Sequence, residues 1–220
     1  TVGRGAGAVA SNTAVGASAL ASNTTGNNNT AVGYQAGYSN TTGGYNTVAG
    51  WQAGYSNSIS STNTFFGYQS GFLTTGANNA FFGPQAGYSV STGTYNSFFG
   101  GGNGAGLLMT TGSKNTIIGA YSGNQGGLNI TTSSNYIVLS DGDGNPRLIG
   151  DGSGNFSIGT NPTSGYRLDI SGGVLRAANT GTLASATQSS YAAQIGNGSA
   201  DLTFDFNQGC RFFKLALIDF

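Results

Sequence analysis

The chain has 220 residues, 40 of them Gly, and its formal net charge is zero, from 7 Lys or Arg against 7 Asp, with no Glu and no His. The charged share of 6% lies far below the roughly 25% of an ordinary soluble domain. Without a basic patch the electrostatic footprint of a nucleic-acid binder is missing. Without His there is no imidazole for acid–base chemistry or zinc, and the single cysteine, Cys210, excludes an internal disulfide.

The first half of the chain carries almost no charge. No Asp, Glu, Lys or Arg stands between Arg4 and Lys114. Such a stretch cannot supply the paired carboxylates of a glycosidase or the oxygen cage of a calcium ion. We therefore expect a scaffold or a binding surface here, with no enzyme activity and no cofactor. The sequence also has no run of about 18 apolar residues, so we expect no membrane insertion.

A repeat of about 17 residues runs through this half of the chain. Each copy holds Asn, a small residue, two apolar residues and Gly, as in residues 29–33 and 46–50. The glycines that close successive copies are spaced by 17, 17, 17, 16, 17 and 19 residues; they are Gly16, Gly33, Gly50, Gly67, Gly83, Gly100 and Gly119. A partial copy, residues 1–3, precedes them. Fixed spacing of this kind is typical of stacked units that cannot bury their faces alone.

Each copy has a second half built on glycine and aromatic residues. Residues 33–38 read Gly-Tyr-Gln-Ala-Gly-Tyr and are echoed at 50–55, 67–72 and 83–88, with Thr-Thr-Gly turns following at 41–43 and 74–76. Gly breaks helices, whereas Thr, Val and aromatic residues favour strands, so each copy reads as two short strands joined by glycine turns. Low-complexity disorder is the alternative, but aromatic residues make up 11% of the chain and recur at fixed places. We predict an all-β fold, a repetitive parallel β-roll or β-solenoid with coils of about 17 residues.

The two apolar residues after each Asn point to opposite faces of a strand. One can face the inside of the coil, but a narrow roll has no second layer to cover the other. Another copy of the chain would cover it, which predicts an intertwined homotrimer with parallel rolls around one axis. The residues predicted to form the roll core and the trimer contacts are Val32, Val48, Phe65, Phe66, Phe81, Phe82, Phe98, Phe99, Ile117 and Ile118.

The repeats resemble a known family. The Asn-Thr-Ala-Val-Gly unit at 29–33 and the Tyr-Gln-Ala-Gly-Tyr unit at 34–38 are similar to the head repeats of trimeric bacterial adhesins of the YadA type, which are left-handed parallel β-rolls. They resemble still more closely the versions in bacteriophage and cyanophage tail fibres. The strings at 135–148, 154–160 and 167–172 are similar to the segment that links such repeats to a distal domain or a C-terminal chaperone in phage fibre proteins. The self-cleaving Ser-Lys dyad of that chaperone is not recognisable in this sequence.

We accordingly divide the chain into β-roll repeats at 1–125, a β connector at 126–173 and a C-terminal β segment at 174–220. That last segment is either a small β domain or the start of one that is cut short. In the connector, Asp141, Asp143 and Asn145 have the alternate-oxygen spacing of a calcium loop, but Pro146 and Gly152 stand where an EF-hand needs Gly and Glu. Asp-Gly and Asn-Pro are also turn dipeptides, so a hairpin turn is the competing interpretation.

Aromatic residues follow the closing glycine in some repeats. Because this position also holds Pro84, Gly101 and Ala120, we expect it outside the core. Exposed rings beside amides suit a glycan, and the alternative is an aromatic ladder between coils. The candidate residues are Tyr34, Gln35, Trp51, Gln52, Tyr68 and Gln69.

The repeats and the resemblance together predict a structural tail fibre protein of a bacterial virus. It would form a trimeric shaft or head that presents or forms a receptor-binding tip, located in the virion and extracellular on host contact. Its partners would be two further copies, other virion tail proteins and a bacterial surface glycan or receptor. The alternatives are a trimeric bacterial surface adhesin or filament subunit, an ice-binding β-solenoid suggested by the Thr-Thr-Gly turns, and a depolymerase tailspike.

Overall fold

The computed structural model describes residues 2–102, 104–159 and 168–170. The chain divides into two compact units, Thr1–Leu175 and Arg176–Phe220, and every described residue belongs to the first. The predicted C-terminal segment at 174–220 therefore lies outside the described residues.

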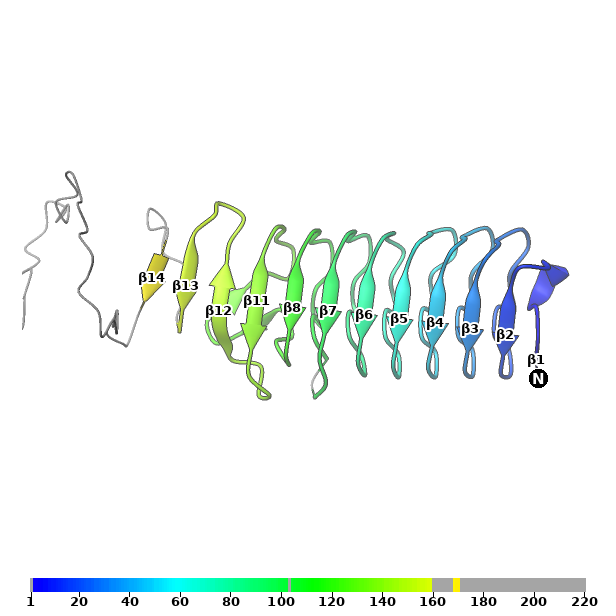
Figure 1. The fold of residues 1–220 in the computed structure, drawn as a ribbon, viewed down its shortest axis with the longest axis horizontal. Helices are drawn as coiled ribbons and strands as arrows, with labels where there is room; N and C mark the ends of the chain where they lie inside the picture. The colour runs from blue at the N-terminus through cyan, green and yellow to red at the C-terminus, as the bar shows by residue number, and fades with distance from the viewer. Residues whose placement is uncertain (1, 103, 160–167, 171–220) are drawn as a thin grey trace, which may run out of the picture. The chain divides into compact units, whose positions relative to one another are not determined.

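The first unit is a β-solenoid, as the repeat predicts. Seven three-residue strands, one from each repeat, stand side by side, and the chain returns behind the sheet between one strand and the next (Figure 1). They are β2 (Thr13–Val15), β3 (Thr30–Val32), β4 (Thr47–Ala49), β5 (Thr64–Phe66), β6 (Ala80–Phe82), β7 (Ser97–Phe99) and β8 (Thr116–Ile118).

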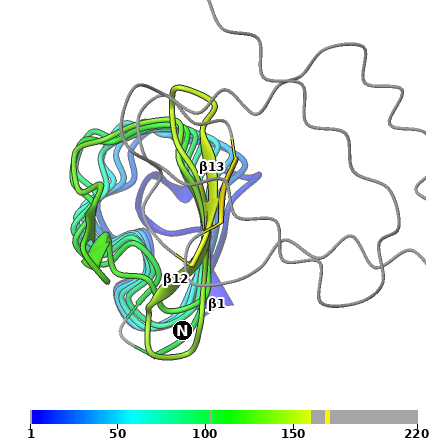
Figure 2. The ribbon, with the colours of Figure 1, turned by 90° about the vertical axis from the view of Figure 1, so that its left-hand side faces the viewer.

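These strands pair in parallel and in register, so that equivalent residues of successive coils lie directly above one another. Thr30, for example, pairs with Thr13 on one side and with Thr47 on the other. Seen along the stack, the coils nearly superimpose on a single outline (Figure 2). Since paired strands lie about 4.8 Å apart, each repeat position becomes a straight column of side chains along the roll.

Each coil contains one strand, so the prediction of two is wrong. The second half of the coil consists of turns, although it stays bonded to the next coil, for instance from Gly37 N to Ala53 O at 2.9 Å. The backbone there passes through left-handed conformations, with φ of 54° at Gln35 and 59° at Gly37. Residues in that conformation cannot continue an extended strand.

The ends of the roll reverse the strand direction. At the start, β1 (Val2–Gly3) pairs antiparallel with β2, so Val2 and Gly3 do not take the place in the parallel stack that the partial copy suggested. The short helix η1 (Ala6–Ala8) follows. At the other end, β11 (Ile137–Ser140) still pairs in parallel with β8, which carries the roll one coil beyond residue 125. The next strands, β12 (Pro146–Gly150) and β13 (Phe156–Ile158), are antiparallel to their predecessors, and β14 (Leu168–Ile170) is parallel to β13. A separate hairpin joins β9 (Asn124–Gln125) to β10 (Leu128–Asn129).

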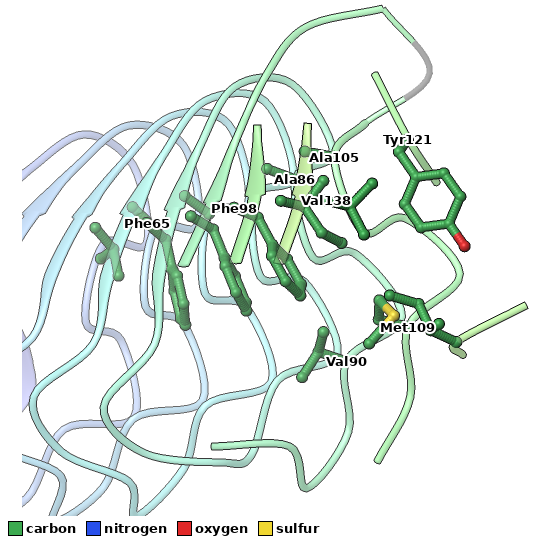
Figure 3. Close-up of a cluster of buried hydrophobic side chains, with 14 of the residues drawn as sticks. Phe65, Ala86, Val90, Phe98, Ala105, Met109, Tyr121 and Val138 are labelled. Carbon is green, nitrogen blue, oxygen red and sulfur yellow. The ribbon is translucent and has the colours of Figure 1, made fainter. Parts of the chain in front are cut away.

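The core is a single column of side chains from the middle of each strand, together with small residues of the returning chain. Phe65, Phe81 and Phe98 are fully buried and stack with centroid distances of 5.1 and 4.8 Å. Figure 3 shows the parallel rings of Phe65 and Phe98 among Ala86, Val90, Ala105 and Met109. Glycine in the returning chain makes room for each ring, because a Cβ on Gly87 would lie 2.4 Å from the Phe81 ring.

Candidate functional site

The most unusual surface of the roll is the outward face of its sheet. The central residue of each strand points inward and its two neighbours point outward, so the face carries two columns of side chains. One column is mainly Thr and the other is apolar. The apolar column, in order along the sheet, consists of Val15, Val32, Ala49, Phe66, Phe82, Phe99, Ile118, Leu139, Leu148 and Ile158.

The ten residues predicted to form the roll core and the trimer contacts fall into two sets, one inside the roll and one in this column. Val48, Phe65, Phe81, Phe98 and Ile117 are at most 2% exposed and form the roll core. The other five point outward on the sheet face. In the single chain Val32 is 41% exposed, Phe66 50%, Phe99 40% and Ile118 48%, while Phe82 is half-buried. Both faces of the strand are therefore apolar, as the sequence indicates, but the described residues cover only one of them.

The rings of Tyr34, Trp51 and Tyr68 stand at the corner where the chain leaves the sheet. They are 46%, 41% and 49% exposed, as expected for a position outside the core. They also form the aromatic ladder: Tyr34 stacks on Trp51 at 6.1 Å and Trp51 on Tyr68 at 5.1 Å between ring centroids. We call these three residues the corner stripe.

The glutamines beside the corner stripe form a ladder of their own. Gln52 Nε2 donates to Gln35 Oε1 at 2.8 Å, and Gln69 Nε2 donates to Gln52 Oε1 at 3.0 Å. The amide of Gln52 is thus both donor and acceptor within the chain. The glycan candidates are brought together, but their amides are bonded mainly to one another.

The asparagines that define the repeat lie inside the roll, a role that the sequence analysis left open. The Oδ1 atom of each accepts a hydrogen bond from the backbone N–H of its equivalent in the next coil, at 2.8 to 3.0 Å over six successive steps. The Nδ2 group donates to a turn carbonyl, as from Asn79 to Gly93 at 2.9 Å. The signal was available in the sequence, because an Asn repeated every 17 residues in a solenoid forms an amide column.

One threonine hydroxyl of each of three Thr-Thr-Gly turns is likewise bonded within the roll. Thr24, Thr41 and Thr75 donate their hydroxyl to a backbone carbonyl of the next coil at 2.9, 3.0 and 3.1 Å. These hydroxyls close turns between coils, in agreement with the turn interpretation of the motif.

The predicted calcium residues lie in the hairpin turn between β11 and β12. Asp141 Oδ1 accepts hydrogen bonds from the backbone N–H groups of Asp143 and Asn145 at 3.1 and 2.9 Å, and Oδ2 accepts one from Arg147 Nε at 3.0 Å. The N–H of Asn145, followed by the guanidinium of Arg147, lowers the pKa of Asp141 to about 2. A calcium ion would have to displace Arg147 from this carboxylate. Among the described residues, no three His, Cys, Asp or Glu side chains group so as to hold a metal ion.

The same turn occurs twice, which the sequence analysis missed. Asp151 Oδ1 accepts hydrogen bonds from the backbone N–H groups of Ser153 and Asn155, at 2.9 Å each. These donors lie two and four residues after the aspartate, as they do for Asp141. Burial raises the pKa of Asp151, but the hydrogen bonds led by the Asn155 side chain outweigh it and lower the pKa overall. The repeated string Asp-Gly-x-Gly-Asn at 141–145 and 151–155 would have revealed both turns, so this motif is one of hairpin geometry.

Within the described ranges, no helix has the length and apolar character needed to cross a membrane. No protein-family model, curated protein or solved structure matches the chain. The columns of the sheet face and the corner stripe are therefore the features on which a function can be argued.

Proposed function

We propose that this chain is a non-enzymatic structural segment of a bacteriophage tail fibre, in which three copies pack their sheet faces around a common axis. The assembly would space and present an adhesive tip that binds a glycan or another receptor on the bacterial surface. It would belong to the virion, contact other tail proteins, and be extracellular when the phage meets its host. The resemblance of the repeats to those of tail fibres supports this role.

The observation that carries the proposal is the apolar column, which the described part of the chain leaves exposed. Its ten rungs span on the order of 43 Å at the usual strand spacing. Phe66, Ile118 and Ile158 along it are 44% to 50% exposed. A continuous apolar surface of this length is rare on a monomer and typical of a protein interface. The charge-free stretch between Arg4 and Lys114 removes the like-charge repulsion that three parallel copies would otherwise meet.

The absolute mass of the 220-residue chain, measured by light scattering after size exclusion, tests the proposal. We expect three times the chain mass of 22.0 kDa. A single-chain mass at micromolar concentration would overturn the trimer and with it the main support for a fibre.

Replacing Phe66 with Asp is the matching variant. We expect it to yield a folded single chain, because the ring is half exposed in one roll but three carboxylates would face one axis in the trimer. A trimeric Phe66→Asp protein would show that the copies do not meet through this column. The Leu73→Asp variant is the control, since Leu73 is 42% exposed but does not belong to the column.

The resemblance leaves one alternative of the same architecture, a trimeric bacterial surface adhesin or filament subunit. A signal peptide and a membrane anchor encoded in the same gene would favour that alternative, and neighbouring genes for virion components would favour the fibre.

A further inference from the structure

The corner stripe, Tyr34, Trp51 and Tyr68, is an exposed aromatic cluster that the proposed trimer does not yet explain. We infer that it packs against a neighbouring copy of this chain and does not take a ligand. This inference rests on the proposed function, because it requires that the copies assemble through their sheet faces.

The geometry of the rings argues against a sugar platform. A sugar binds an aromatic residue by lying on the ring face, and in this stripe neighbouring rings cover one another's faces. The interplanar angles are 18° for Tyr34 with Trp51 and 9° for Trp51 with Tyr68. The stripe therefore presents mainly ring edges to solvent, beside glutamines that bond to each other. Ring edges of this kind suit an apolar protein surface.

The corner stripe also continues the apolar column. Each of its residues follows a column residue by two positions, as Tyr34 follows Val32, so their Cα atoms are at most about 7 Å apart. From the second coil on, column and corner residues mostly vary in opposite directions, whereas the first coil, with Val15 and Ala17, is small at both places. Where the column is small, at Val32 and Ala49, the corner holds Tyr34 and Trp51.

In later coils the large ring moves from the corner to the column. Phe82 in the column has Pro84 at the corner, and Phe99 has Gly101. Only the coil of Phe66 and Tyr68 carries a ring at both places. Such compensation in size is expected if column and corner fill one interface of nearly constant width. It has no reason to occur between a structural column and an independent ligand site.

The area of the combined surface agrees with a contact between copies. Nine large side chains of column, corner and adjoining sheet face are each 40% to 52% exposed; they are Val32, Tyr34, Trp51, Phe66, Tyr68, Phe99, Ile118, Ile137 and Ile158. At roughly 150 to 250 Å² for a whole aromatic side chain, and less for Val and Ile, they expose on the order of 800 Å². That exceeds the usual largest patch of a monomer, roughly 300 to 600 Å², and matches the roughly 800 Å² that each partner buries in a stable complex.

A second copy is the occupant that fits. The region around the stripe contains no charged residue from position 5 to 113, so a partner must offer an equally uncharged surface, as an identical roll does. In a parallel symmetric assembly equal heights meet, which brings the stripe of one copy beside the neighbouring copy at the same coil.

Trp51 is the single tryptophan of the chain and reports directly on this contact. Its fluorescence and its quenching by acrylamide should be measured on the full chain, at the concentration at which light scattering gives the mass. The control is the double variant Trp51→Phe, Ile59→Trp, which moves the tryptophan to a position 67% exposed outside the sheet face. We expect blue-shifted emission from Trp51 and a quenching constant at least threefold smaller than in the control.

The outcomes separate the two proposals. A trimer whose Trp51 is quenched as readily as the control tryptophan would overturn the inference and leave the proposed function intact. A single-chain mass would overturn both. A shift in Trp51 emission on addition of a soluble linear oligosaccharide such as cellohexaose would also overturn the inference, and would restore the glycan interpretation.

A charge placed in the stripe gives a second, independent readout. We expect Tyr68→Lys to raise the concentration at which the assembly dissociates at least tenfold, because the ammonium would be buried against an apolar neighbour. Leu73→Lys is the matched control and should leave that concentration unchanged. Equal behaviour of the two variants would count against the contact.

Discussion

Replacing Phe81 with Ala tests whether the roll is held by its inner column of rings. Phe81 is fully buried and stacks between Phe65 and Phe98, at 5.1 and 4.8 Å. Removal of a buried Phe side chain costs about 3 to 5 kcal/mol, depending on how far the site collapses. Here the opposite wall is Gly87, whose missing side chain cannot fill the space.

Two further contributions place the expected loss at the upper end of that range. Each of the two neighbouring rings loses a stacked partner, at about 0.5 to 1.5 kcal/mol for each pair. In addition, the hydrogen-bonded coils cannot close up along the axis. We therefore expect Phe81→Ala to lower the free energy of unfolding by about 4 to 5 kcal/mol.

Urea unfolding followed by far-ultraviolet circular dichroism measures this loss, with wild type and variant at one protein concentration so that assembly contributes equally. The control is Ile59→Ala, because Ile59 is 67% exposed and should change stability by no more than about 0.5 kcal/mol. A loss below about 1.5 kcal/mol for Phe81→Ala, with an unchanged denaturant slope, would refute the assignment of this ring to a rigid core.

Three other changes have predictable results. Thr62→Asn should stabilise the roll by about 1 kcal/mol in thermal melts, because Thr62 is held at a φ of 63° where three other coils carry Asn; no gain would mean that this conformation costs nothing. Asn79→Ala should destabilise by about 2 to 4 kcal/mol in urea titrations, since it leaves a buried carbonyl at Gly93 and a buried N–H in the next coil unpaired, and a neutral result would show that water replaces the amide. The pKa of Asp141 is lowered to about 2, so the stabilisation from its bonds is present above its ordinary pKa near ~4 and is lost as pH falls toward 2. The melting temperature should therefore drop less between pH 4 and pH 2 in Asp141→Asn than in wild type, and equal drops would contradict this account.

The stacking of the coils could be predicted from the sequence because the residues that define the repeat are the ones that fix the backbone. The glycine that closes each repeat sits where a Cβ would meet the next coil. A Cβ on Gly50, for example, would lie 2.2 Å from the carbonyl oxygen of Gly67. The spacing of these glycines gives the coil length directly. The apolar pairs, by contrast, could not tell which residue faces inward. Both Phe65 and Phe66 are apolar, so the alternation that normally distinguishes the two faces of a strand is missing.

Other features escaped prediction for different reasons. The second half of each coil has strand-forming composition, but Gln35 and its equivalents adopt left-handed φ, which propensity does not reveal. The reversal of strand direction at β12 depends on the tight turn at Asp141. The same turn recurs at Asp151, and a search for short repeats would have found it. The corner stripe was correctly placed outside the core, because a position that accepts Trp51, Pro84 and Gly101 is not packed on all sides.

The hydrogen bonds between coils run along the axis of the roll, as from Gln52 N to Tyr34 O at 2.9 Å and from Asn46 N to Asn29 Oδ1 at 2.9 Å. A pulling force applied to the two ends therefore loads one interface between coils after another, in series. Each coil that yields would release a length of chain near 55 Å in place of its rise of about 5 Å. When a single roll is stretched from its two ends, it should lengthen in equal steps of about 50 Å. It would therefore absorb work under tension before it ruptures.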